Sequence, residues 1–161
     1  MAVLHTRMHD TPVGDVTIVA DDGALVGVHL GPVPSTAVVG TRDDDALGAA
    51  RDQLAAYLAG EVVAFDLPLA PQGSTFQLRV WEELRAIPYG EIRSYLDIAT
   101  GLGGRDLVRA VGAANGANPI AIVVPCHRVI GSDGSLVGYA GGLHRKRTLL
   151  DLEAGVGTLF A

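Results

Sequence analysis

Short runs of apolar and β-branched residues, bounded by turn signals, open the chain. They span residues 3–7, 15–20 and 24–30 and predict three β-strands. The stretches between them, residues 11–14 and 21–23, contain the Pro, Asp and Gly residues that are typical of tight turns. Consecutive strands joined by tight turns pair antiparallel, so we expect an antiparallel meander.

The next apolar pattern has helical spacing. After a break at residues 31–35, apolar positions recur on one helical face from about Asp43 to Ala59. That face comprises Leu47, Ala50, Leu54, Tyr57 and Leu58. One further strand is predicted at residues 62–66. The stretch 67–73 has the composition of a linker, and we place a boundary there between two domains, residues 1–73 and residues 74–161.

Two capping signatures predict helices in the second domain. Ser74 with Gln77 predicts a helix to about Ala86, and Ser94 with Asp97 predicts a short helix to about Thr100. The expected buried stripe of the first comprises Phe76, Val80, Leu84 and Ile87. After the glycine-rich turn 101–104, another helix is predicted from about residue 105 to residue 115. Two short helices around a glycine turn are typical of a helix-turn-helix, but pairs that only pack a core share this pattern.

The body of the second helix of that pair consists mostly of small residues around Arg109, which is the one long cationic side chain there. Small residues allow a helix to approach a nucleic-acid groove, and they equally allow close packing against another helix. Arg109 could pair with a carboxylate or reach into a duplex, and both interpretations stay open on the sequence alone.

Charge and composition narrow the class of protein. The chain has 161 residues, 48% of them hydrophobic, and a net charge of −6. Residues 1–78 hold 3 basic and 10 acidic side chains, whereas residues 79–147 hold 9 basic and 6 acidic ones. This division fits a protein whose second part contacts phosphates, and ordinary variation of surface charge would equally produce it. The N-terminus does not resemble a signal peptide and no apolar run approaches a membrane span, so we expect a cytoplasmic protein without membrane contact.

The one cysteine of the chain lies in the segment Val123-Val124-Pro125-Cys126-His127-Arg128. One cysteine excludes an intramolecular disulfide, and no Cys/His spacing of a structural zinc site is present. Cys126 is a candidate nucleophile, and His127 and Arg128 could lower its pKa by about two units toward the reactive thiolate. The alternative is a small buried residue at the end of a core strand, although burying His127 and Arg128 without partners would be costly.

Further motifs accompany this segment in a fixed order. They are Ile87-Pro88-Tyr89-Gly90, Ser94-Tyr95, Arg109-Ala110-Val111-Gly112, Asn118-Pro119, Pro125-Cys126-His127-Arg128-Val129-Ile130, Gly138-Tyr139, Gly141-Gly142 and Glu153. In this order and spacing, residues 76–153 closely resemble the O6-alkylguanine-DNA alkyltransferases, which are self-inactivating DNA repair proteins. Residues 1–73 resemble the ribonuclease-H-like domain of that family more loosely.

The resemblance implies an α+β protein. An N-terminal ribonuclease-H-like antiparallel sheet with a helix would be followed by a mainly helical C-terminal domain that contains the helix-turn-helix and the active-site loop. The implied activity is direct-reversal repair, in which the alkyl group of O6-alkylguanine, with O4-alkylthymine as a second candidate, moves irreversibly to Cys126. Each molecule would act once, because water does not hydrolyse the thioether product.

The resemblance also implies catalytic roles. His127 would act on Cys126 through a water, Glu153 would orient the imidazole, and the side chain of Asn118 would tie the recognition element to the active-site loop. Tyr95 would donate to the departing purine at N3. Opposite orientations of neighbouring side chains in an extended segment would likewise favour a bridging water between Cys126 and His127.

The implied partner is double-stranded DNA, entered from the minor groove with the alkylated base flipped out, and the protein is expected to be a monomer in solution. Arg109 would fill the gap that the base leaves. The expected DNA contacts comprise Arg109, Tyr95, Ala110, Gly112, Ala113, Asn115 and Arg128. The expected pocket around the base comprises Tyr139, Val129, Ala140 and Gly141.

Some positions depart from the pattern of the family. Relatives with an N-terminal zinc site use cysteines that this chain lacks, so neither a metal nor a cofactor is expected. Asn115 stands where some relatives place a bulky apolar side chain against the flipped base, and Ala140 replaces a serine of some relatives.

Two other classes of protein share parts of these patterns. A cysteine hydrolase using Cys126, His127 and Glu153 would turn over repeatedly. A noncatalytic DNA-binding regulator using residues 94–115 would retain its function as Cys126→Ala and would prefer a defined sequence.

Overall fold

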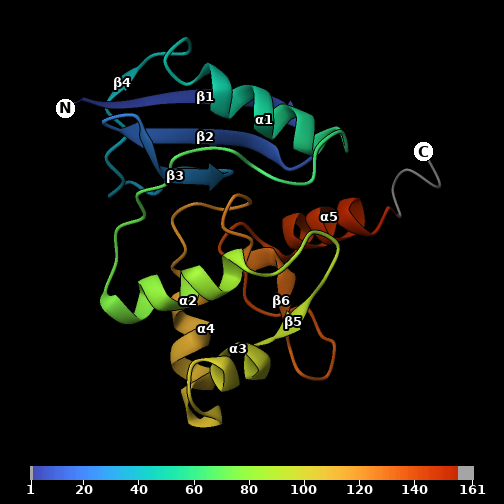
Figure 1. The fold of residues 1–161 in the computed structure, drawn as a ribbon. Coiled ribbons are helices and arrows are strands. Elements are labelled where there is room, and N and C mark those ends of the chain that lie inside the picture. Colours follow the sequence, from blue (N-terminus) through green and yellow to red (C-terminus); the bar gives the residue numbers. More distant parts are fainter. Residues whose placement is uncertain (1, 156–161) are drawn as a thin grey trace. The chain divides into compact units, whose positions relative to one another are not determined.

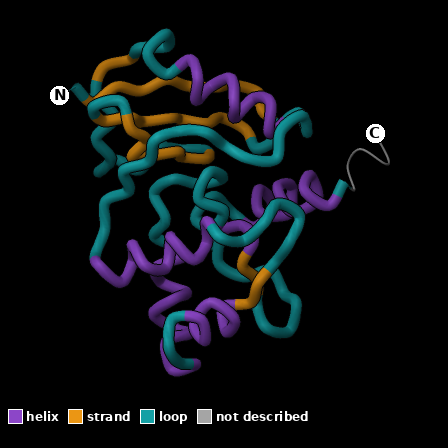
Figure 2. Tube along the Cα trace, viewed as in Figure 1, coloured by secondary structure: helices purple, strands orange, loops and turns teal. Residues whose placement is uncertain are grey.

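The computed structural model describes residues 2–155. The chain divides into two compact units, residues 1–71 and residues 72–161. Helices and strands are distributed over both units, so the α+β class expected from the sequence is confirmed (Figure 1; Figure 2).

The first unit is built on a four-stranded sheet. Its strands are β1 (Val3–Thr11), β2 (Gly14–Asp21), β3 (Ala24–Leu30) and β4 (Thr41–Arg42). They lie in the order β3-β2-β1-β4, and the β1/β2 and β2/β3 pairs are antiparallel, as the predicted meander requires. The short strand β4 pairs parallel to β1 at Leu4 and was not predicted.

Helix α1 (Gly48–Leu58) belongs to the same unit and buries all five residues of its predicted apolar face. The helix begins later than predicted, because a turn precedes it in which the Asp43 side chain accepts from the backbone N–H of Ala46 at 3.0 Å. Residues 44–47 form this turn, and helix α1 follows it directly.

The predicted strand at residues 62–66 is wrong. The carboxamide of Gln53 bonds both backbone groups of Asp66, at 3.0 Å to its carbonyl and 2.8 Å from its N–H, and so takes the place of a strand neighbour. Backbone pairing occurs later, where Leu25 bonds to Pro68 and Ala70, each at 2.8 Å.

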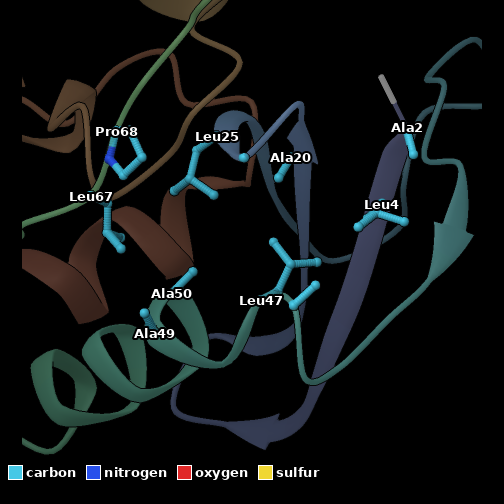
Figure 3. A pocket seen from close by; sticks show the side chains of 11 residues that line it. Ala2, Leu4, Ala20, Leu25, Leu47, Ala49, Ala50, Leu67 and Pro68 are labelled. Atoms are coloured by element: carbon cyan, nitrogen blue, oxygen red, sulfur yellow. The ribbon is translucent and has the colours of Figure 1, made fainter.

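A hollow of about 140 Å³ lies at the side of α1 that faces the sheet (Figure 3). Its lining includes Leu4 of β1, Leu25 of β3, Ala50 of α1 and the segment Leu67–Pro68. Every lining residue is apolar or glycine, so the hollow offers no polar side chain for catalysis or for binding a ligand.

The second unit is mainly helical. It contains α2 (Thr75–Arg85), α3 (Tyr95–Gly101), α4 (Val108–Gly116) and α5 (Leu143–Ala154), with the short parallel strands β5 (Arg93–Ser94) and β6 (Val129–Ile130) (Figure 1). Both predicted capping boxes are present, with Ser74 and Gln77 at the start of α2 and Ser94 and Asp97 at the start of α3. Each box satisfies two otherwise free N–H groups and thereby sets where the helix begins.

Helix α2 packs through a stripe that differs slightly from the predicted one. Val80, Leu84 and Ile87 are buried, whereas Phe76 is only half-buried. Trp81 is buried as well, and its indole N–H donates to the Ala114 carbonyl of α4 at 2.8 Å. Together with the shared apolar surface, this bond fixes α2 against the helix pair.

Helices α3 and α4 form the predicted helix pair. A glycine-containing turn and a 3₁₀ turn (Arg105–Leu107) join them. Val111 and Ala114 face the core, while Arg109, Ala110 and Ala113 are exposed on the outer side of α4. None of the helices within residues 2–155 is long and apolar enough to span a bilayer.

Candidate active site

The segment around the cysteine is compact, not extended. Cys126, His127 and Arg128 form a 3₁₀ turn, and strand β6 follows directly. The expected extended segment with neighbours on opposite sides is therefore wrong. All three side chains are buried, with exposed fractions of 5%, 0% and 7%.

Asn118 shapes the approach to this turn. Its Oδ1 accepts from the Ile120 N–H at 3.0 Å and its Nδ2 donates to the Val124 carbonyl at 2.8 Å. The enclosed segment bends so sharply that Ile122 has a φ of 71°, which is unusual for a β-branched residue. The Asn118 side chain thus supplies hydrogen bonds that a regular element would otherwise provide, and it lies close enough to Cys126 to lower the pKa of the thiol against the effect of burial.

Glu153 of α5 joins His127 and Arg128 in one buried ionic network. Its Oε2 lies 2.7 Å from His127 Nε2 and 2.9 Å from Arg128 Nη2, and its Oε1 lies 2.8 Å from Arg128 Nε. Arg128 also donates to the Ile87 carbonyl at 2.7 Å, and the Gly90 N–H donates to Glu153 at 3.3 Å. The paired guanidinium and carboxylate are what permits two charged side chains to be buried here.

This network sets the tautomer of His127. Burial lowers the pKa of the imidazole, against the opposing effect of Glu153, so the ring is neutral near pH 7. An ionised carboxylate only accepts hydrogen bonds, so Nε2 carries the proton and Nδ1 is left as an acceptor. His127 Nδ1 is buried and has no hydrogen-bond partner within the described residues.

The Cys126 thiol is protonated in this arrangement. Burial raises its pKa, and hydrogen bonds with Asn118 and Tyr139 and the charge of Lys146 offset only part of that rise. The expected lowering of the thiol pKa is therefore wrong, because burial outweighs the groups that would stabilise the thiolate. The charge of Arg128 is compensated by Glu153, and a neutral imidazole adds none.

Lys146 is the functional candidate that sequence reasoning missed. It is fully buried on α5 and donates to the carbonyls of Val129 at 2.6 Å and Val137 at 2.9 Å. Its Nζ lies 5.8 Å from the centre of the Tyr95 ring. The signal was available, because Lys146, Leu149 and Glu153 follow the i, i+3, i+7 spacing of a buried helix face.

Tyr95 and Asn115 lie beside the nucleophile. The Tyr95 hydroxyl donates to the Val137 carbonyl at 3.1 Å, and burial and the nearby Cys126 raise its pKa. Asn115 is 2% exposed, and its Nδ2 lies 3.4 Å from the Cys126 carbonyl. The structure thus brings together Cys126, His127, Glu153, Asn118 and Tyr95, which were predicted as catalytic residues.

The predicted pocket residues lie on β6 and on the loop before α5. Val129 is fully buried on β6, Tyr139 and Gly141 are half-buried, and Ala140 is exposed. Tyr139 lies close enough to Cys126 to lower the pKa of the thiol against the effect of burial, which places this loop at the nucleophile.

The predicted DNA contacts fall into two groups. Arg109, Ala110 and Ala113 are exposed on α4, and Gly112 is half-exposed with nothing within 4 Å of an added Cβ. Arg128 and Asn115, by contrast, are buried, so they do not lie on the exposed surface of α4, and their contact with DNA stays a prediction. Glu153 holds Arg128 inside, and Asn115 faces Cys126 because it lies on the inner side of α4.

Comparisons with known proteins relate this chain to proteins that are named for methyl transfer to a cysteine. The family described as 6-O-methylguanine DNA methyltransferase, DNA binding domain, matches residues 75–155, and the ribonuclease-like domain of the same family matches residues 4–71. The methylated-DNA–protein-cysteine methyltransferase of Mycobacterium tuberculosis is 48% identical over 94% of this chain and 93% of its own. The protein of that name from Methanosarcina acetivorans is 44% identical over 93% of this chain and 98% of its own.

Solved structures show the same likeness. The crystal structure of Mycobacterium tuberculosis O6-methylguanine methyltransferase superposes with a TM-score of 0.88 at 45% identity, covering 99% of both chains. The structure of the Mycobacterium tuberculosis OGT in complex with DNA gives a TM-score of 0.86 at 46% identity, covering 96% of this chain and 94% of that one. The chain belongs to the O6-methylguanine DNA methyltransferase family.

Proposed function

We propose that this protein repairs alkylated DNA by moving the alkyl group of O6-alkylguanine to its own Cys126. The observation that carries the proposal is a buried thiol one residue from a neutral histidine, whose Nδ1 is an unused acceptor and whose Nε2 is held by a carboxylate. Family membership and relatives that are named for acting on methylated DNA support it. O4-alkylthymine is a second candidate substrate.

The reaction is a single displacement at an sp3 carbon. Sγ of Cys126 forms a bond to the alkyl carbon as the bond from that carbon to O6 breaks, and the bonding pair leaves with the guanine. The thiol proton passes through a water to His127 Nδ1, and the guanine takes a proton at N3 from Tyr95 as its negative charge develops. Proton exchange through water then moves the guanine proton from N3 to N1 and passes the proton on His127 back to Tyr95. A thioether and an unmodified guanine are the products, so one molecule of protein removes one alkyl group.

The raised pKa of Cys126 fits this sequence of events. A resting thiolate would react with any electrophile that entered, whereas a protonated thiol reacts only when His127 takes its proton. Lys146, close enough to lower the pKa of the thiol, would stabilise the thiolate as it forms. We assign Lys146 this electrostatic role, together with that of holding the Val129 and Val137 carbonyls in place.

The outer side of α4 is the proposed surface for double-stranded DNA. Ala110, Gly112 and Ala113 would let this helix approach the minor groove, and the exposed Arg109 would occupy the gap left by the flipped base. The pocket for the base would lie between Tyr95 and the loop containing Tyr139. We propose that the protein acts as a cytoplasmic monomer, with residues 1–73 as the ribonuclease-H-like domain and residues 74–161 as the DNA-binding and alkyltransferase domain.

Intact-protein mass spectrometry tests the proposal. Protein mixed with duplex DNA that carries O6-methylguanine should gain one methyl group per chain, confined to Cys126 and absent from Cys126→Ser. Product that exceeds the amount of protein would contradict the single-turnover reaction and favour a hydrolase.

A second experiment tests the role of Arg109. Arg109→Ala should slow repair of duplex DNA far more than reaction with free O6-benzylguanine, because only the duplex requires an extruded base. Arg85→Ala serves as a control, since Arg85 is an exposed arginine on α2 whose ion-pair partner, Glu82 at 3.6 Å, lies on the same helix. Equal losses on both substrates would remove Arg109 from base extrusion.

A further inference from the structure

The carboxamide of Asn115 is buried beside the nucleophile with one of its two polar atoms unused. The side chain is 2% exposed, yet its Oδ1 has no hydrogen-bond partner in the part of the chain that the structure describes. Buried acceptors without a donor are rare in folded proteins, and in a binding pocket the ligand can supply the missing donor. Asn115 has no place in the chemical step proposed above.

The contacts of the NH₂ group show that Asn115 lies beside the residues of the proposed pocket. Nδ2 donates to the Cys126 carbonyl at 3.4 Å, and Asn115 lies close enough to Tyr95 to lower the pKa of that hydroxyl against the effect of burial. Cys126 and Tyr95 are the residues that the proposed reaction places against the base. Since the bond to the Cys126 carbonyl uses the NH₂ group, the orientation of the amide leaves Oδ1 as the free acceptor.

The chemistry of the lesion identifies the matching donor. Alkylation at O6 removes the proton from N1 of guanine, so in DNA the exocyclic 2-amino group is the only N–H donor on the alkylated base. O4-alkylthymine and O6-alkylhypoxanthine have no amino group. A hydrogen-bond acceptor in the pocket therefore favours O6-alkylguanine over O4-alkylthymine and O6-alkylhypoxanthine.

We propose that Asn115 is a specificity-determining residue whose Oδ1 accepts a hydrogen bond from the 2-amino group of O6-alkylguanine. The inference rests on the proposed function, and it adds a preference for guanine over thymine lesions. A pocket built to hydrogen-bond a substrate group discriminates strongly against analogues that lack it, because the buried partner is then left unpaired.

The test compares single-turnover rates on three duplexes that differ only in the lesion, which is O6-methylguanine, O6-methylhypoxanthine or O4-methylthymine. The wild-type protein should favour O6-methylguanine over O6-methylhypoxanthine by about tenfold to a hundredfold. Asn115→Leu, which keeps the branched shape and the number of heavy atoms but has no acceptor, should bring that ratio close to one. Free O6-benzylguanine and O6-benzylhypoxanthine should show the same change, because the effect does not require DNA.

Two controls separate this effect from general damage to the site. Gly116→Ala alters the same helix at a position where an added methyl meets no atom within 4 Å, and it should keep the wild-type ratio. Asn115→Met provides a second apolar variant in case Asn115→Leu folds poorly. A substitution that only disturbs the fold would lower the transfer rates from all lesions together and leave the ratio of the rates on O6-methylguanine and O6-methylhypoxanthine unchanged.

The outcomes are distinct. A wild-type ratio near one, or an unchanged ratio in a folded Asn115→Leu or Asn115→Met protein, overturns the role of Asn115. A protein that transfers no methyl group from O6-methylguanine to Cys126 overturns the proposed function itself.

Discussion

Replacing Glu153 by glutamine should disrupt the buried network without creating a cavity. The carboxylate accepts from Arg128 at both oxygens and from His127 at one of them. A glutamine can present only one acceptor oxygen, and either orientation of its amide places an NH₂ group against an N–H of Arg128. Arg128, 7% exposed, would keep its charge with one strong partner lost.

The expected cost follows from burial. Removing one partner of a buried ion pair destabilises a protein by about 3–5 kcal/mol, because the remaining charge is left uncompensated. The exposed pair of Glu91 and Arg93, 3.1 Å apart, provides the matched control, and Glu91→Gln should cost about 0–1 kcal/mol. The free energy of unfolding can be measured in urea by fluorescence, since Trp81 is the only tryptophan of the chain and is 2% exposed.

The same substitution should slow alkyl transfer in the fraction that stays folded. With the amide NH₂ facing His127 Nε2, the ring would carry its proton on Nδ1 and could no longer accept one from Cys126. General base catalysis contributes at least about 100-fold, so we expect a loss of about that size in single-turnover rate. A cost below about 1 kcal/mol in stability, or an unchanged rate, would refute this account of the network.

Three further predictions follow from the site. Tyr95→Phe should slow methyl transfer about 100-fold while changing the free energy of unfolding by no more than about 1.5 kcal/mol, and an unchanged single-turnover rate would exclude proton donation by Tyr95. Lys146→Met should shift the pH profile of Cys126 alkylation by iodoacetamide to higher pH, because a cation that lowers the thiol pKa is lost; a shift to lower pH would contradict this role. The pKa of His127 is lowered from 6.5 by burial, so the unfolded chain binds a proton at this residue at a higher pH than the native protein does. Its contribution to stability is therefore complete above pH 6.5 and is lost as the pH falls toward the folded pKa, by up to about 1.4 kcal/mol per pH unit. The free energy of unfolding, measured by urea titration at several pH values in this range, should fall more steeply with falling pH in the wild type than in His127→Asn.

Local features of the second unit were predictable because neighbouring residues decide them. The capping boxes at Ser74 and Ser94 depend on a side chain that meets a backbone N–H three residues away, and both helices begin where the sequence indicates. The strands of the meander and the buried face of α1 are equally local, since periodicity sets which side chains share a face. The strand predicted at residues 62–66 failed because its competitor, Gln53, lies outside the segment.

The amino-acid sequence by itself determined the secondary structure of most of the chain and singled out Cys126, His127 and Glu153 through the order of their motifs. Only the tertiary structure decided the protonation of these groups. The pKa of the thiol is raised, Arg128 and Asn115 are buried, and Lys146 is enclosed under the loop before α5. The reason is that burial and ion pairing depend on which distant segments meet in space, and Glu153 lies 25 residues beyond the Arg128 that it neutralises.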